Sequence, residues 1–129
     1  MERINRDNYL SILKNFKDQQ IIKVITGIRR CGKSTLLEIY QDYLRDIGVE
    51  DNQIISINFE DADYEKLQDR KKLYEHIKSK LVKGRKTYVF LDEIQNVNEF
   101  EKTVDSLFIN KDVDLYITGS NAYLLSSEL

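Results

Sequence analysis

The segment from Gly27 to Ser34, which reads GIRRCGKS, carries the clearest chemical pattern in the chain. It matches G-x-x-x-x-G-K-[ST] at every fixed position. A loop that wraps closely around a phosphate needs glycine at its turns, because several backbone N–H groups must converge on the anion. The lysine adds a positive charge, and the hydroxyl group after it is suited to binding Mg²⁺. The pattern therefore predicts a loop that binds a nucleoside triphosphate together with Mg²⁺.

Within this loop the lysine and the serine have separate expected roles. Lys33 should contact the β- and γ-phosphates, and the Ser34 hydroxyl should ligate Mg²⁺. A helix that begins near Lys33 would add its free N–H groups and the positive end of its dipole. Arg29 and Arg30 either hold phosphate or face a partner, and the sequence leaves both interpretations open. The residues expected to contact the nucleotide are Gly27, Ile28, Arg29, Arg30, Cys31, Gly32, Lys33, Ser34 and Thr35.

Two carboxylates follow the apolar run Thr87–Leu91 (TYVFL). An enzyme that cleaves a triphosphate needs a carboxylate at the tip of a strand to hold the Mg²⁺ shell, and Asp92 is the candidate, acting mainly through water ligands. Glu93 comes next, and a second carboxylate there suits a base that polarises the attacking water. The alternative for Glu93 is a solvated residue at the end of a strand. The pair favours hydrolysis of the nucleotide.

The same residues narrow the choice of nucleotide and reaction. Small-molecule kinases on this fold often lack the second acid, so a kinase is the less favoured enzyme, and a non-hydrolysing nucleotide-dependent switch is a further alternative. The segment 110–114 (NKDVD) is close to the guanine-binding element Asn-Lys-x-Asp. It is one residue out of register, however, and it precedes its strand instead of following one. ATP is therefore the expected nucleotide.

Helices and strands that alternate along the chain are expected to position these residues. Such alternation predicts the α/β class, with right-handed crossovers and a parallel sheet of about four strands that is covered on both faces. Ligands bind beyond the carboxyl ends of the strands in such sheets. The predicted strands are Ile21–Thr26, Ile54–Phe59, Thr87–Leu91 and Asp114–Thr118, and the predicted helices cover 8–17, 33–47, 69–82, 99–109 (capped by Asn98, with Glu101 three residues on) and 122–129.

The bulk composition is that of one soluble globular domain. The chain has 129 residues, 41% of them apolar and 33% charged, with a net charge of −2. The single cysteine excludes an internal disulfide, and neither a secretory signal nor a membrane-spanning run is present, so a cytoplasmic location is expected. The segment 69–86 holds eight Lys or Arg residues and two acids. A nucleic-acid interface is possible there, but a solvated helix face is the favoured interpretation.

With both motifs in place, the chain resembles the AAA+ and related P-loop ATPases that carry an additional catalytic glutamate. More narrowly, it resembles a group of prokaryotic predicted ATPases. The phrases that carry this resemblance are GIRRCGKS at 27–34, FLDEIQNV at 90–97, and ITGSN at 117–121 followed by LLSSEL. The resemblance runs from about Asn8 to Leu129 and implies the three-layer fold of P-loop NTPases.

The resemblance also implies roles beyond the two motifs. A polar residue after the fourth strand senses the γ-phosphate in such ATPases; Ser120 and Asn121 are favoured here over Thr118, with simple turn chemistry as the alternative. Asn58 is expected to restrain the catalytic glutamate.

Compared with complete AAA+ modules, the chain lacks the fifth strand and the lid helices. We therefore interpret residues 1–129 as the N-terminal part of such a module, which in the whole protein continues into a C-terminal region and can form a homo-oligomer. No arginine finger or second sensor can be assigned. Because positive charge supplied to the transition state is worth about 10³–10⁵ in rate, the isolated chain is expected to bind ATP better than it hydrolyses it.

Overall fold

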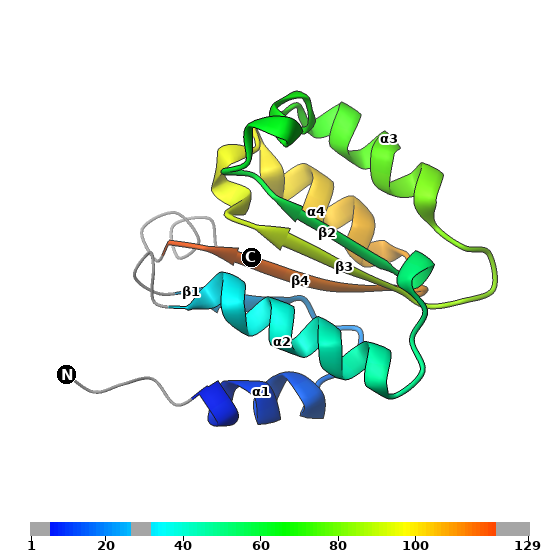
Figure 1. Cartoon of the computed structure of the whole chain (residues 1–129). Coiled ribbons are helices and arrows are strands. Elements are labelled where there is room, and N and C mark those ends of the chain that lie inside the picture. Colours follow the sequence, from blue (N-terminus) through cyan, green and yellow to red (C-terminus); the bar gives the residue numbers. More distant parts are fainter. Residues whose placement is uncertain (1–5, 27–31, 121–129) are drawn as a thin grey trace.

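The computed structural model describes residues 6–26 and 32–120 and contains a four-stranded parallel sheet (Figure 1). The strands follow the order β1-β4-β3-β2 across the sheet. This confirms the predicted α/β class. The strands are β1 (Lys23–Thr26), β2 (Ile54–Asn58), β3 (Thr87–Asp92) and β4 (Val113–Gly119); the helices are α1 (Arg6–Asn15), α2 (Lys33–Asp46), α3 (Arg70–Lys80) and α4 (Phe100–Ile109), with short 3₁₀ helices η1 (Asp51–Gln53), η2 (Ala62–Gln68) and η3 (Ile94–Asn96).

The two central strands of the sheet are more deeply buried than the two strands at its edges. Every residue of β3 and β4 is buried, because helices cover both faces of a parallel sheet. In β1 and β2, at the edges, burial alternates instead, and Val24 remains 42% exposed. The continuous apolar runs that predict β3 and β4 are thus explained by their central positions.

Helices form the two outer layers of the three-layer arrangement (Figure 1). Helices α3 and α4 pack on one face of the sheet through buried residues such as Leu73 and Val104. Helix α2 covers the other face through Tyr40 and Leu44, and α1 packs beside it through Leu13. None of the helices in the described residues is long and apolar enough to span a membrane.

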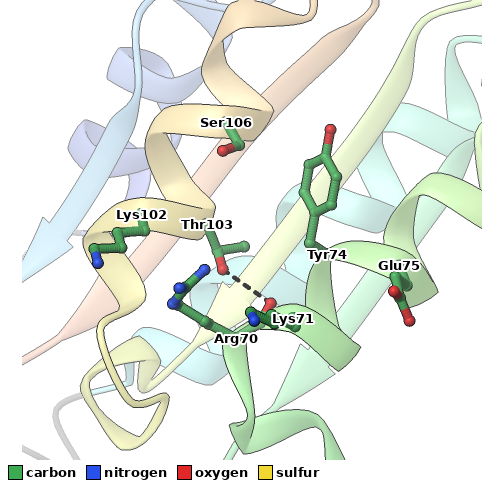
Figure 2. A pocket seen from close by; sticks show the side chains of 7 residues that line it. All are labelled: Arg70, Lys71, Tyr74, Glu75, Lys102, Thr103 and Ser106. Carbon is green, nitrogen blue, oxygen red and sulfur yellow. Dashed lines mark hydrogen bonds between the residues drawn. The ribbon is translucent and has the colours of Figure 1, made fainter.

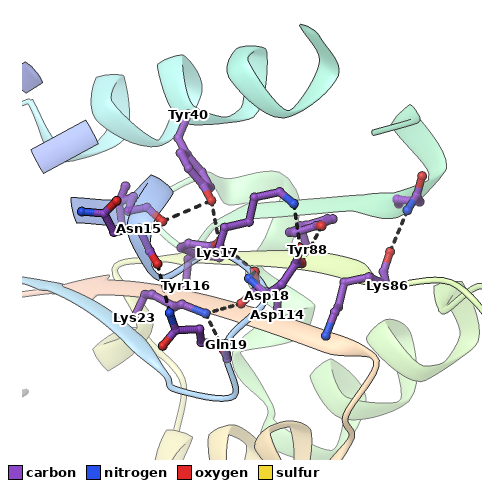
Figure 3. A network of polar contacts seen from close by, with 12 residues as sticks. Asn15, Lys17, Asp18, Gln19, Lys23, Tyr40, Lys86, Tyr88, Asp114 and Tyr116 are labelled. Carbon is purple, nitrogen blue, oxygen red and sulfur yellow. Dashed lines mark hydrogen bonds and ion pairs between the residues drawn. The ribbon is translucent and has the colours of Figure 1, made fainter. Parts of the chain in front are cut away.

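A buried polar network closes the amino-terminal end of the sheet, opposite the end where β3 reaches Asp92 (Figure 3). Lys23 of β1 forms an ion pair with Asp114 of β4. The carboxylate of Asp114 also accepts a hydrogen bond from Tyr116 Oη at 2.8 Å and another from the backbone N–H of Asp18 at 2.9 Å. Tyr88 Oη donates to Asp18 at 2.7 Å, and burial raises the pKa of Tyr88 to about 12. The network fixes the connection between α1 and β1 against the sheet.

Some predicted boundaries differ from the structure. Helix α4 begins at Phe100 with Glu99 as its N-cap residue, and no side chain caps it, so the predicted cap at Asn98 is wrong. The reason is that the backbone N–H of Asn98 donates to Gln68 O at 3.1 Å, which fixes Asn98 outside the helix. Helix α1 starts earlier than predicted, at Arg6, and α3 ends at Lys80, before the predicted end at residue 82. The predicted helix at 122–129 lies outside the described residues.

Candidate functional site

The strand order brings the carboxyl ends of β1, β4 and β3 together at one end of the sheet. Because β4 lies between β1 and β3, the end of β4 lies between the end of β1 and the acids at the end of β3. The N-cap residue of α2 is Gly32, whose φ of 88° is favourable for glycine. No side chain in the described residues caps this helix, so its N-terminal N–H groups suit an anion. The site is therefore built around the start of α2.

Asp92 at the end of β3 joins two hydroxyl groups that are distant in the sequence. Ser34 Oγ donates to one carboxylate oxygen of Asp92, and Thr118 Oγ1 donates to the other. Asp92 is only 6% exposed, so these hydrogen bonds satisfy a buried charge. The two residues predicted to hold Mg²⁺, Ser34 and Asp92, thus lie in contact.

Glu93 is held in a defined orientation by contacts on its backbone and its side chain. Its backbone lies in the left-handed region, with φ 59°. The backbone N–H donates to Thr118 Oγ1 at 2.9 Å, and the carbonyl oxygen accepts from Asn96 Nδ2 at 3.2 Å. One carboxylate oxygen, Oε1, accepts from Gln95 Nε2 at 2.7 Å. The other, Oε2, lies 3.5 Å from Lys33 Nζ. These contacts aim the carboxylate toward the start of α2.

The residues at this end of the sheet fit Mg²⁺ and a phosphate chain. Ser34 and Asp92 offer hydroxyl and carboxylate oxygens, which are the ligands that Mg²⁺ prefers. Among the described residues, no group of three or more His, Cys, Asp or Glu side chains is arranged to hold a metal ion. Ser120 Oγ and Gln95 Oε1 are buried and have no hydrogen-bond partner within residues 6–26 and 32–120. Orphaned polar atoms of this kind are costly, and a polar ligand would satisfy them.

The structure brings together most of the predicted site residues that it describes. Lys33, Ser34, Asp92 and Glu93 are in direct contact through the hydrogen bonds and the ion pair described above. Lys33 Nζ also donates to Gly119 O at 3.2 Å, which places it at the end of β4, next to Ser120. Thr35 lies in the first turn of α2 with its side chain exposed. The predicted residues Gly27, Ile28, Arg29, Arg30, Cys31 and Asn121 lie outside the described residues.

Asn58 lies beside the site but has a different partner from the one expected. It pairs in register with Asp92 across β2 and β3. Its side-chain oxygen accepts from the backbone N–H of Glu60 at 3.0 Å and stabilises the turn after β2. The amide that contacts the Glu93 carboxylate belongs to Gln95. A restraint of Glu93 by Asn58 stays a prediction.

Two residues of the site have little signal in the sequence. Gln95 is a single polar residue two positions after an acid, and that pattern alone assigns it no role. Thr118 is less favoured than its neighbours Ser120 and Asn121 on the resemblance alone. All seven residues of β4 are buried, however, and a polar side chain on such a strand must find a hydrogen-bond partner, which is the signal that identifies Thr118.

Replacing Thr118 with Val should destabilise the site. Valine has nearly the same shape but leaves the buried Glu93 N–H without an acceptor and Asp92 without one donor. We expect the free energy of unfolding to fall by about 1–3 kcal/mol in a urea titration. Thr118→Ser keeps the hydroxyl and is the matched control. Equal unfolding midpoints for Thr118→Val and the wild type would show that these hydrogen bonds contribute nothing.

Two comparisons with known proteins give matches over most of the chain. Residues 19–129 match the family model described as "AAA domain". The chain is also 44% identical over 127 residues to a Haemophilus influenzae protein described as uncharacterized. That alignment covers 98% of this chain and 32% of the relative, so the chain spans about a third of the relative's length. No solved structure matches the chain.

Proposed function

The chain belongs to the AAA domain family, and from this premise we propose that it binds Mg-ATP and hydrolyses it as part of a larger AAA+-like ATPase. The proposal rests on one observation. Lys33, Ser34, Asp92 and Glu93 lie together at the carboxyl end of the parallel strands. A cation, a hydroxyl and two carboxylates with different partners are the groups that nucleotide hydrolysis requires.

The two carboxylates have different environments and so suit different roles. Asp92 accepts from two hydroxyls and, with Ser34, would hold Mg²⁺. Bound there, Mg²⁺ supplies positive charge that offsets the charge developing on the phosphates. Among the described residues, the side chain of Glu93 has an ammonium and an amide as its partners. It is the group suited to take a proton from water.

Lys33 couples the binding of nucleotide to the release of the Glu93 carboxylate, which then acts as a base. Phosphate oxygens would draw the Lys33 ammonium away from Glu93 Oε2, which is 3.5 Å from it. The freed Oε2 then accepts the proton of a water whose oxygen attacks the γ-phosphorus in line with the departing diphosphate. Gln95 holds Oε1 during this step and fixes the direction of the base. The products are ADP and inorganic phosphate.

Ser120 is proposed as a donor to the γ-phosphate. Its Oγ is buried and without a partner in the described residues, and it directly follows Gly119, whose carbonyl oxygen accepts from Lys33. Asn121 is proposed as a second donor from the same loop. Charge from the rest of a longer protein would complete the site, so turnover by this chain alone should be slow.

The experiment that tests the function is a calorimetric titration of the chain with a non-hydrolysable ATP analogue and Mg²⁺. We expect binding that weakens when EDTA removes the metal, because Ser34 and Asp92 then lose the ion that bridges them to phosphate. A GTP analogue measured in parallel should bind more weakly. Failure of both analogues to bind would contradict the proposal, and equal affinities would contradict the preference for adenine.

A further inference from the structure

A groove between α3 and α4 lies on the face of the sheet away from α2 (Figure 2). Its volume is about 160 Å³, and it is open to solvent. Arg70 and Lys71 of α3 and Lys102 of α4 supply its cations, and Glu75 is the one acid that lines it. In Figure 2 the Glu75 carboxylate points away from Lys102. The remaining lining residues all carry hydroxyl groups: Tyr74, Thr103 and Ser106.

The cationic end of the groove is formed by the beginnings of both helices. Thr103 Oγ1, in the first turns of α4, donates to the backbone oxygen of Arg70, the first residue of α3, at 3.1 Å (Figure 2). The positive ends of the two helix dipoles therefore lie at the same end of the groove. Arg70 and Lys102 add full charges there.

A carboxylate of the chain already binds at this end. Glu99 Oε1 lies 3.1 Å from Arg70 Nε, and Glu99 Oε2 lies 3.4 Å from Lys102 Nζ. The hydrogen bond from Arg70 lowers the pKa of the Glu99 carboxyl below its usual value. The Glu99 side chain is 51% exposed, so an anion from solution can compete with it for both cations. A phosphate group offers more acceptor oxygens to these cations than a carboxylate does.

Positive charge continues along α3 beyond the groove. Within the described residues, no ion pair neutralises Lys71, Lys72, Lys78 or Lys80. The ammonium of Lys78 lies 5.7 Å from the centre of the Tyr74 ring. The eleven residues of α3 extend over about 16 Å. Lys71 and Lys78 lie two helical turns apart on the Tyr74 side of α3, whereas Lys72 and Lys80 face other directions. Cations spaced in this way along the groove suit a polyanion better than a single small anion.

We propose that the α3–α4 groove, together with Lys78 beside it, binds the phosphate backbone of a nucleic acid, which displaces Glu99 from Arg70 and Lys102. Arginine, lysine, serine, threonine and tyrosine side chains and helix N-termini are the groups that contact nucleic-acid phosphates. Tyr74 adds an aromatic ring on which a base can stack. An acidic peptide would use the cations but not the ring, so nucleic acid is the better match.

The first test measures fluorescence anisotropy of a labelled single-stranded oligonucleotide with the full chain and no nucleotide present. Lys71→Ala with Lys102→Ala should weaken binding on the order of tenfold and make its salt dependence shallower, because two phosphate contacts are lost. The matched control is Lys14→Ala with Lys111→Ala, which removes the same charge outside the groove. Absence of binding at low salt, or equal weakening in both double variants, would overturn the proposal.

The second test asks for a gain of affinity, which loss of folding cannot produce. Glu99→Gln removes the competing carboxylate and should tighten oligonucleotide binding severalfold. Glu38→Gln, on the exposed side of α2, makes the same charge change and should leave the affinity unchanged. Polyglutamate should compete weakly with the labelled strand. Competition as strong as that of unlabelled DNA, or no difference between the two glutamine variants, would refute recognition of nucleic acid by this groove.

Discussion

Replacing Glu93 with Gln is expected to slow ATP hydrolysis by about 10²–10⁴-fold, the usual contribution of a general base. Glutamine keeps the shape of the side chain and can still accept the hydrogen bond from Gln95, but it cannot take a proton from water. It also removes the negative partner of Lys33, so phosphate no longer competes with Glu93 for that ammonium. Affinity for ATP should stay the same or rise. Single-turnover release of phosphate and calorimetry measure the two effects separately.

Glu38→Gln serves as the control for this variant, because Glu38 is exposed on α2 and makes the same change of charge. A small-molecule kinase that uses Asp92 as its base would lose much less activity when Glu93 is replaced. Retention of hydrolysis within about tenfold of the wild type, a loss smaller than a general base accounts for, would therefore exclude Glu93 as the base. Tight binding without turnover in the wild type, even within a longer protein, would favour a switch.

Replacing Lys33 with Ala should weaken binding of the ATP analogue by at least about 100-fold. The ammonium is expected to contact two phosphate groups, and each charge-assisted hydrogen bond contributes about 1.5–3 kcal/mol. In the structure Lys33 is only 7% exposed, so water replaces these contacts poorly. Calorimetric titration in the presence of Mg²⁺ measures the loss. Binding within tenfold of the wild type would show that the phosphates do not reach Lys33.

The Lys33 variant needs a companion variant because it leaves Glu93 buried without its cation. Burying an uncompensated charge is destabilising, so a loss of affinity could arise from unfolding. The double variant Lys33→Ala with Glu93→Gln removes both charges. We expect it to fold, as judged by its urea transition, and still to bind the analogue poorly. Recovery of affinity in the double variant would mean that Lys33 acts only by neutralising Glu93.

The class of the fold was predictable because its strands have strong local signals. The runs that form β3 and β4 are apolar and β-branched or aromatic, and a glycine or an acid ends each of them. The motif residues Lys33, Ser34, Asp92 and Glu93 follow from spacing alone, and the structure places them in contact. Their catalytic roles stay predictions.

The strand order and the finer contacts had no comparable local signal. Nothing in the segment Lys23–Thr26 specifies that its neighbour is β4, because pairing between distant strands depends on the packing of the whole sheet. The left-handed backbones of Glu93 and Glu99 could not be predicted from the sequence either, since such conformations are uncommon for residues other than glycine. These conformations set the directions of the Gln95 contact and of the Glu99 carboxylate, so both were found only in the structure.

The strand order also determines when the site can form as the chain is synthesised. Strand β1 has β4 as its neighbour in the sheet, and the ion pair that joins them links residues 91 positions apart. Strands β2 and β3 pair with each other, and both leave the ribosome before β4. Helix α2 therefore follows a strand, β1, that has no neighbour in the described sheet until β4 is made. Of the four strands in the described residues, β4 is the last to be synthesised, and its pairing brings the end of β1 and the residues Lys33, Asp92 and Glu93 together.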